Sequence, residues 1–371
     1  MGLETFSGTT FAGGTCLCPC VQAALNDIVG RNTYALRRDR VGTVEFLRSP
    51  DNLVGVQALQ NIVDPGNGKK KCVTINYYTK ACDSSVSSSI TDDCSSGTEP
   101  APLCTEFEVT HELESQQLVF DEDHMRLLCA PLGTVDNDWI MLQIYAQMNA
   151  LLVALDKRVL ALLLANVGAF MDGRTLKQVQ LLNTINSDAV GPRPWALINF
   201  QHEFDEAGLY GVPNVIGGDL VNKYFKAIGL GAVNAAGLDV SKLGGEANFY
   251  FDRFVQSVFG NDEFLVMAPG VAQLVTWSRY VGPYAKKTAS FEHGQIVDPF
   301  TGIPFDLKMH YNDCTDHYYI KLQLAWDVFF IPEDAEASEC DMHGVSGIFN
   351  YQYCDELSEC PTVTGDSSPT E

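Results

Sequence analysis

Five residues whose side chains could bind a metal lie close together between positions 310 and 317. They are His310, Asp313, Cys314, Asp316 and His317, and imidazole, thiolate and carboxylate groups are the usual ligands of zinc. They also fall between two stretches in which apolar and polar residues alternate, where a polar turn between strands is expected without any metal. We favour the turn and predict no metal site.

Other residues that could do chemistry lack the partners that a mechanism needs. His111 and Glu112 are neighbours, as are His202 and Glu203, but neither pair has a nucleophile at a recognisable spacing. The stretch 229–234 (GLGAVN) begins like a dinucleotide-binding fingerprint, yet it has Asn where the third glycine belongs. No G-x-S-x-G, H-E-x-x-H or phosphate-loop motif occurs. We therefore predict no catalytic residues, no cofactor and no enzymatic activity.

The composition predicts an ordered, acidic protein. The chain has 371 residues, 46% of them hydrophobic, and a net charge of −23. Its length favours two domains or one domain with large insertions. Such a charge disfavours general binding to nucleic-acid phosphates and to anionic membranes. No secretory signal and no Asn-x-Ser/Thr site is visible, so we expect synthesis in the cytoplasm. The one strong basic cluster, residues 31–40 with Arg48, is either a solvated face or an arm that docks on an acidic neighbour.

Twelve cysteines are unusual for a protein made in the cytoplasm. None has the paired C-x-x-C spacing of a zinc ribbon. We favour partly buried free thiols, and disulfides within or between subunits remain an alternative. The cysteines are Cys16, Cys18, Cys20, Cys72, Cys82, Cys94, Cys104, Cys129, Cys314, Cys340, Cys354 and Cys360.

The central element is one long helix, predicted over residues 136–170. Apolar residues recur at alternating steps of four and three, which places them on one helical face. Asp156, Lys157 and Arg158 interrupt the apolar run, so the segment lacks the ~20 uninterrupted apolar residues of a membrane span. We expect a structural spine in the protein core. The residues of the face are Met141, Tyr145, Met148, Leu152, Leu155, Val159, Leu162, Ala165 and Ala169.

One pair of strands is predicted before this helix in the sequence, and another pair after it. Residues 73–78 and 105–110 read as strands joined by a polar, Ser- and Asp-rich tip over 83–102, which makes an extended hairpin. Residues 303–311 and 320–330 alternate apolar and polar side chains, so we expect an antiparallel pair with one face covered by the helix.

The region 175–300 is rich in glycine and mixes short strands and helices. A strand at 213–216 is followed by a helix from Asp219, and a buried strand at 264–267 by a helix from Pro269 to about Val281. This repetition predicts an α/β subdomain. The acidic, Ser-rich segment after Pro332 is predicted to be a surface extension.

The order of these parts resembles the HK97-fold major capsid protein of tailed bacteriophages, over about residues 30–335. The segment 264–270 (FLVMAPG) and the segment 294–304 (GQIVDPFTGIP) look like late parts of such proteins. The resemblance implies an α+β fold with a spine helix, an extended β-hairpin (the extension loop), an α/β axial domain and antiparallel peripheral strands. It divides the chain into an N-terminal arm (1–50), the extension loop (51–112), the peripheral domain with the spine (113–190), the axial domain (191–299), return strands (300–335) and an acidic C-terminal extension (336–371).

The same resemblance implies a function. The chain would be a structural subunit that self-assembles into the pentamers and hexamers of an icosahedral phage head, part of a virion, around DNA that it contacts without sequence specificity. Portal, scaffold or decoration proteins would be further partners, and a membrane would not. Three alternatives remain: an encapsulin-like nanocompartment shell, a disulfide-stabilised surface protein, and an α/β enzyme that uses residues 191–299.

Overall fold

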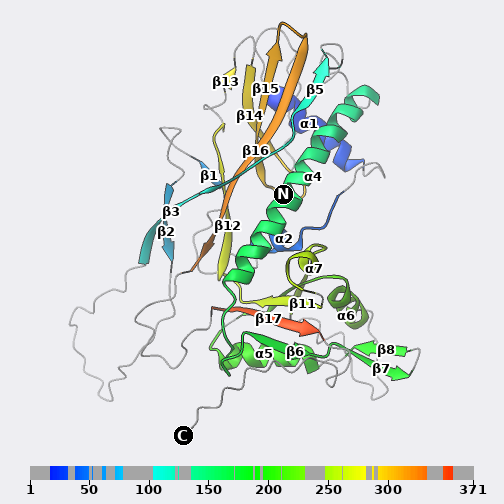
Figure 1. Cartoon of the computed structure of the whole chain (residues 1–371), viewed down its shortest axis with the longest axis vertical. Helices are drawn as coiled ribbons and strands as arrows, with labels where there is room; N and C mark the ends of the chain where they lie inside the picture. Colours follow the sequence, from blue (N-terminus) through cyan, green and yellow to red (C-terminus); the bar gives the residue numbers. More distant parts are fainter. Residues whose placement is uncertain are drawn as a thin grey trace, which may run out of the picture.

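The computed structural model is organised around one long helix that lies along a large sheet and reaches a second sheet at its far end (Figure 1). The predicted α+β class is confirmed. The structure describes residues 17–31, 38–49, 52, 61–63, 72–77, 103–121, 124, 135–170, 172–186, 189–192, 195–209, 211–229, 247–260, 262–280, 286–287, 291–331 and 346–353.

The long helix, α4, spans Val135–Ala165. The first six residues of the predicted apolar face, from Met141 to Val159, are all buried, whereas Leu162 and Ala165 are partly or fully exposed. The helix ends five residues before the predicted position, since the amide of Asn166 turns back to Leu163 and its side-chain amide donates to the carbonyl of Leu162 at 2.8 Å. The weakening of the apolar pattern therefore marks the real end of the helix.

The large sheet has eight strands and is almost entirely antiparallel. Its main order is β1-β12-β16-β15-β14-β13, and β4 and β5 both pair with β16. The strands are β1 (Asn61–Val63), β4 (His111–Glu114), β5 (Leu118–Asp121), β12 (Ala272–Ser278), β13 (Lys286–Lys287), β14 (Phe291–Val297), β15 (Pro304–Asn312) and β16 (His317–Phe330).

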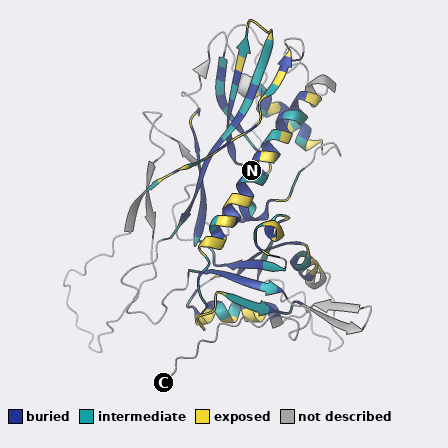
Figure 2. Ribbon diagram, viewed as in Figure 1, coloured by how far each residue is buried: buried dark blue, intermediate teal, exposed yellow. Residues whose placement is uncertain are grey.

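The predicted antiparallel pair with a helix on one face is confirmed by β15 and β16. Met309 lies opposite Ile320, and Leu307 opposite Leu322. Side chains of both strands share one core with Leu155 of α4 and with α1 (Leu17–Gly30). Figure 2 shows buried residues where α4 faces the sheet and exposed residues on its outer side.

The second sheet has five strands and lies at the C-terminal end of α4. Its order is β10-β9-β11-β17-β6. Alternate residues face two cores: Leu265 of β11 contributes to the core shared with α4, whereas Phe264 and Val266 face a second core built with α5 and α6. The elements are β6 (Leu176–Val179), α5 (Trp195–Glu206), β9 (Asn214–Gly217), α6 (Asp219–Gly229), β10 (Asn248–Phe251), β11 (Glu263–Met267) and β17 (Ile348–Tyr353). The strands predicted at 213–216 and 264–267 and the helix predicted from Asp219 are confirmed.

Two predictions in the second half of the chain are wrong. The helix predicted from Pro269 to Val281 is strand β12, because a turn at Gly270 (φ 84°) redirects the chain into a fully buried slot between β1 and β16. The segment after 336 is not simply a surface extension, because β17 lies between β11 and β6 and is almost entirely buried. Residues 191–299 also contribute strands to both sheets, so this predicted unit does not coincide with either one.

The predicted extended hairpin is present as β2 (Cys72–Tyr77) and β3 (Leu103–Glu108), which pair antiparallel. Among the described strands, the two pair only with each other, and Figure 1 shows them beside the large sheet. The predicted tip at 83–102 lies outside the described residues. The remaining elements are α2 (Gly42–Leu47), α7 (Val255–Val258), β7 (Leu182–Asn186) and β8 (Ala189–Pro192).

Candidate functional site at the junction of the two sheets

Of the residues considered as metal ligands, Asp313, Cys314 and Asp316 lie in the turn between β15 and β16. His310 lies in β15, and His317 is the first residue of β16. Cys314 is a free, exposed thiol whose backbone amide donates to Asn312, and Asp316 accepts a hydrogen bond from the hydroxyl of Tyr311 at 3.0 Å. The ring of His317 bonds the carbonyl of Thr315. Within the described part of the chain, no three His, Cys, Asp or Glu side chains come together as a metal site requires.

The two histidine–glutamate pairs lie in different parts of the fold. His111 stacks on Trp326 at 4.9 Å between ring centroids and lies 3.3 Å from a carboxylate oxygen of Asp327, at the base of the hairpin. His202 pairs with Glu206 on the exposed side of α5. The structure therefore does not bring these pairs together. The predicted turn at 229–234 lies outside the described residues beyond Gly229.

Three arginines of the basic cluster are engaged inside the chain. Arg31 makes two hydrogen bonds to Asp138 at the start of α4, at 2.9 and 2.5 Å. Arg38 bonds Glu45 at 2.6 Å, and Arg48 donates to the carbonyl of Gly302. Burial lowers the pKa of Arg48 to about 10. These three arginines thus contact residues of their own chain: Arg31 connects the end of α1 to α4, and Arg48 connects the end of α2 to the turn after β14.

Cys20 of α1 is disulfide-bonded. Our prediction of free thiols is therefore wrong for this residue.

The segment 38–49, which we call the junction segment, is the point where the two sheets and α4 meet. Its helix α2 contacts α4, β9 and β10 of the second sheet and β12 of the large sheet. The approach to β10 is so close that a Cβ on Gly42 would lie 2.5 Å from the carbonyl oxygen of Phe251. Only glycine fits at this position without a shift of the backbone.

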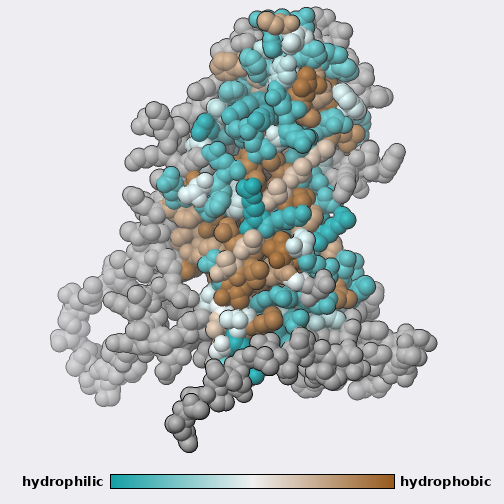
Figure 3. All heavy atoms as spheres, in the orientation of Figure 1, coloured by the Kyte–Doolittle hydropathy of each residue, from teal (hydrophilic) through white to brown (hydrophobic). Residues whose placement is uncertain are grey.

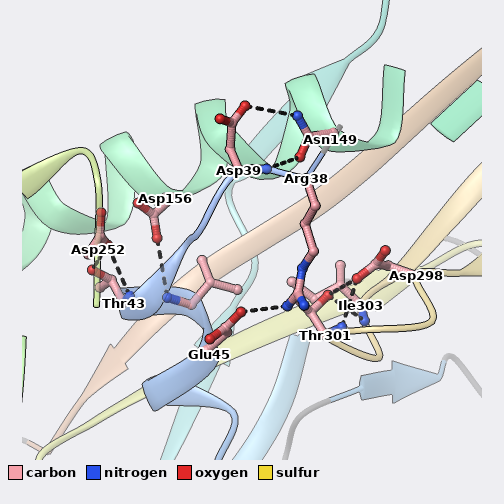
Figure 4. Close-up of polar contacts among 11 residues, drawn as sticks. Arg38, Asp39, Thr43, Glu45, Asn149, Asp156, Asp252, Asp298, Thr301 and Ile303 are labelled. Atoms are coloured by element: carbon pink, nitrogen blue, oxygen red, sulfur yellow. Dashed lines mark hydrogen bonds and ion pairs between the residues drawn. The ribbon is translucent and has the colours of Figure 1, made fainter. Parts of the chain in front are cut away.

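Polar side chains from α4 and from the segment after β10 hold the junction segment (Figure 4). Asp252, which follows β10, accepts hydrogen bonds from the amide and the hydroxyl of Thr43 at 3.0 and 2.5 Å. The backbone amide of Asp39 donates to Asn149 of α4, and the Asn149 side chain donates back to the Asp39 carboxylate, each at 3.0 Å. Arg253 also bonds Asp39, at 3.0 Å.

Asp156 lies at the centre of this junction, in the middle of α4. It is fully buried, and one of its carboxyl oxygens accepts a hydrogen bond from the amide of Val44 at 3.3 Å (Figure 4). Burial raises the pKa of Asp156 well above its usual value, and the negative charge of nearby Asp252 raises it further. A buried carboxyl group with a raised pKa at this place is the feature that sequence reasoning missed. The signal was an acid inside an apolar helix, which we interpreted only as an interruption.

A second anchor of the same segment lies at the turn between β14 and β15. Asp298 accepts hydrogen bonds from the amide and the hydroxyl of Thr301, both at 2.7 Å. The guanidinium of Arg38 lies 4.0 Å from the centroid of the Phe300 ring in the same turn. These contacts position backbone segments, and the site is therefore suited to fix the relative placement of the two sheets.

Comparisons with known proteins concern the fold. No protein-family model matches the sequence, and no curated protein matches it. Solved structures do match over most of the chain. The capsid asymmetric unit of cyanophage A-1(L) shows 9% identity and a TM-score of 0.48, covering 86% of this chain and 94% of that chain. The capsid of Ralstonia phage GP4 shows 10% identity and a TM-score of 0.44, covering 88% and 94%. A chain of Mycobacterium phage Adephagia shows 13% identity and a TM-score of 0.43, covering 87% and 92%. With these identities and scores, the similarity does not by itself assign a function to this chain.

Proposed function

We propose that the protein is the major capsid protein of a tailed phage, with an HK97-like fold, and that its role is structural rather than enzymatic. The observation that carries the proposal is the hairpin β2–β3, which pairs with no other strand that the structure describes. A two-stranded hairpin alone is only marginally stable in water. Such an element gains stability from a further packing surface, and a second molecule is the surface that we propose.

The base of the hairpin supports this role, because it is firmly attached to the large sheet. Phe107, at the end of β3, meets Phe329 edge-to-face at 5.4 Å, and Val109 is fully buried beside them. Asp327 accepts hydrogen bonds from the amide and the hydroxyl of Thr110, at 3.0 and 2.7 Å. A rigid base with a projecting arm is suited to grip a neighbouring subunit.

The outer face of α4 is a second surface that favours self-association. Figure 3 shows apolar side chains around the C-terminal half of this helix. Its exposed residues from position 150 onward are Ala150, Ala161, Leu164 (36% exposed) and Ala165, together with the charged Lys157 and Arg158. An apolar surface of this kind is typical of contact sites between proteins. None of the helices in the described ranges combines the length and apolar composition that crossing a bilayer requires.

We assign the parts of the subunit as follows. The large sheet with α1 and α4 is the peripheral domain, the second sheet with α5 and α6 is the axial domain around which pentamers and hexamers form, and β2–β3 belongs to the extension loop. The acidic charge of −23 is compatible with a wall that does not hold packaged DNA tightly. The virion is then the site of action, with portal, scaffold or decoration proteins as further partners.

Electron microscopy of the purified full-length protein tests the proposal. We expect closed shells of uniform size, and we expect that a variant lacking residues 84–102 folds, as judged by circular dichroism, but forms no shells. An Asp313→Asn variant, changed at an exposed turn, is the control and assembles normally. A chain that stays a monomer under all assembly conditions would refute the proposal. Shells that enclose a protein in place of nucleic acid would assign the chain to the nanocompartment alternative.

A further inference from the structure

Two buried carboxyl groups from different elements face the same short segment of backbone. Asp156 comes from the middle of α4 and Asp252 from the end of β10, and both are completely buried. Between them lies the first turn of α2, whose residues Thr43 and Val44 each donate a backbone amide to one of the two acids. The pair therefore connects the junction segment to the long helix and to the second sheet at once.

The hydrogen bonds divide the two acids into a charged one and a neutral one. Asp252 accepts three: two at one oxygen from Thr43 and one at the other oxygen from the amide of Phe254 at 2.7 Å. Three donors are what a buried carboxylate needs. Asp156 accepts one long hydrogen bond at Oδ1, no donor bonds its Oδ2, and its carboxyl group lies close enough to that of Asp252 for a hydrogen bond between the two when a proton is present. An oxygen without a donor is the place where a proton is bound, since two adjacent carboxyl groups in a buried site do not both ionise.

The charged groups around the pair do not offset a second negative charge. The charges that act on Asp156 are those of Asp252 and Glu45, both negative. The nearby cations are engaged elsewhere: Arg38 bonds Glu45, Arg253 bonds Asp39, and the Lys157 ammonium lies over the ring of Phe254 at 5.0 Å. The remaining charged residues of the packed elements are Arg40 and Arg158, both exposed, and Arg48 beside Gly302.

We propose that Asp156 and Asp252 form a proton-dependent latch that holds the junction segment between α4 and the second sheet. While Asp156 is protonated, its neutral carboxyl tolerates burial next to the Asp252 carboxylate, and α2 stays docked. Loss of the proton puts two like charges in one buried site, and α2 separates from at least one of them. The protein thereby couples the relative placement of its two sheets to pH.

The direction of the coupling follows from the raised pKa of Asp156. A carboxyl group whose pKa is higher in the closed form than in the open form stabilises the closed form fully below its ordinary pKa, and this stabilisation is lost as the pH rises through the closed-form value. Opening is therefore favoured on the alkaline side. Between the two pKa values, the equilibrium constant for opening rises about tenfold for each pH unit.

Hydrogen–deuterium exchange of the full-length protein over about pH 5 to about pH 9 measures this opening. Protection factors of peptides covering 42–47, corrected for intrinsic exchange and compared with β15, should fall in the wild type by up to about tenfold per pH unit. Asp156→Asn keeps the shape and the hydrogen-bond donor of the neutral acid. In this variant the exchange protection of residues 42–47 should therefore be independent of pH. Asp313→Asn, at an exposed position, should behave like the wild type. Equal pH dependence in wild type and Asp156→Asn, or none in the wild type, would overturn the proposal.

A second measurement uses the wild-type protein alone and therefore does not depend on whether a variant folds. Infrared difference spectra of the wild type between neutral and alkaline pH should show the carbonyl band of a buried, protonated carboxyl group disappear as the protection of α2 falls. Absence of such a band at neutral pH would show that Asp156 is already ionised, and the latch would then not exist.

Discussion

The clearest test of the architecture is a pair of leucine truncations on opposite faces of α4. Leu155 is fully buried in the core that the helix shares with the large sheet, whereas Leu164, nine positions further along the same helix, is 36% exposed. Both changes to Ala remove the same atoms and have the same small effect on helix propensity. Any difference between them therefore measures packing alone.

The expected difference is large. Replacing a buried Leu by Ala costs about 2–5 kcal/mol, because transfer free energy is lost and a cavity is left. A change at a partly exposed position usually stays within about 0.5 kcal/mol. Since a native protein is stable by only about 5–15 kcal/mol, Leu155→Ala removes a substantial share of the total.

Guanidinium unfolding of the unassembled full-length chain, followed by tryptophan fluorescence, gives both values. Trp326 is fully buried in the same core as Leu155, so its fluorescence changes when this core unfolds. Leu155→Met conserves the side-chain volume and should cost less than about 1.5 kcal/mol, which keeps the series measurable if the alanine variant aggregates. Equal effects of Leu155→Ala and Leu164→Ala would mean that the buried face of α4 is not the one described.

Three further predictions address the contacts around the core. Gly42→Ala should cost about 1–3 kcal/mol by overpacking against the backbone of β10, whereas Gly30→Ala, with no atom within 4 Å of the added Cβ, should be neutral or slightly stabilising in the same unfolding assay. Asp306→Ala should cost about 1–3 kcal/mol for each donor left unpaired, of which the Ser278 hydroxyl at 2.6 Å is the nearest; Ser278→Ala should recover part of the loss in the double variant. Arg31→Ala should shift the midpoint of unfolding by urea, a non-ionic denaturant, only slightly at low salt and not at all at high salt, because its ion pair is exposed; a large, salt-independent shift would contradict this.

The elements that could be predicted from the sequence are those whose pattern is set by their own residues. The apolar residues of α4 repeat at helical spacing, and apolar and polar residues alternate along β15 and β16. In each case the local sequence alone indicates the conformation and the buried face. The hairpin β2–β3 was predictable for the same reason, as was the turn between β15 and β16 that contains Asp313, Cys314 and Asp316.

Where prediction failed, tertiary context decided the conformation. Pro269 resembles the first residue of a helix, yet β12 becomes a strand because it enters a slot between two strands that lie far away in the sequence. The segment around β17 is acidic and rich in Ser, and within it β17 contributes Phe349, Tyr351 and Tyr353 to the second core. Asp156 has no local pattern at all, because its role depends on Asp252, ninety-six positions away in the chain.

The position of β17 has a consequence for the order in which the chain folds. Strand β6 is made early and lies at one edge of its sheet, but its only described strand neighbour is β17, which comes 169 residues after the end of β6. While the polypeptide is being synthesised, the half-built sheet therefore exposes one side of β11 to its surroundings. A prematurely terminated chain keeps that exposed edge permanently. We therefore expect incomplete chains to aggregate or be degraded before they can associate with complete chains.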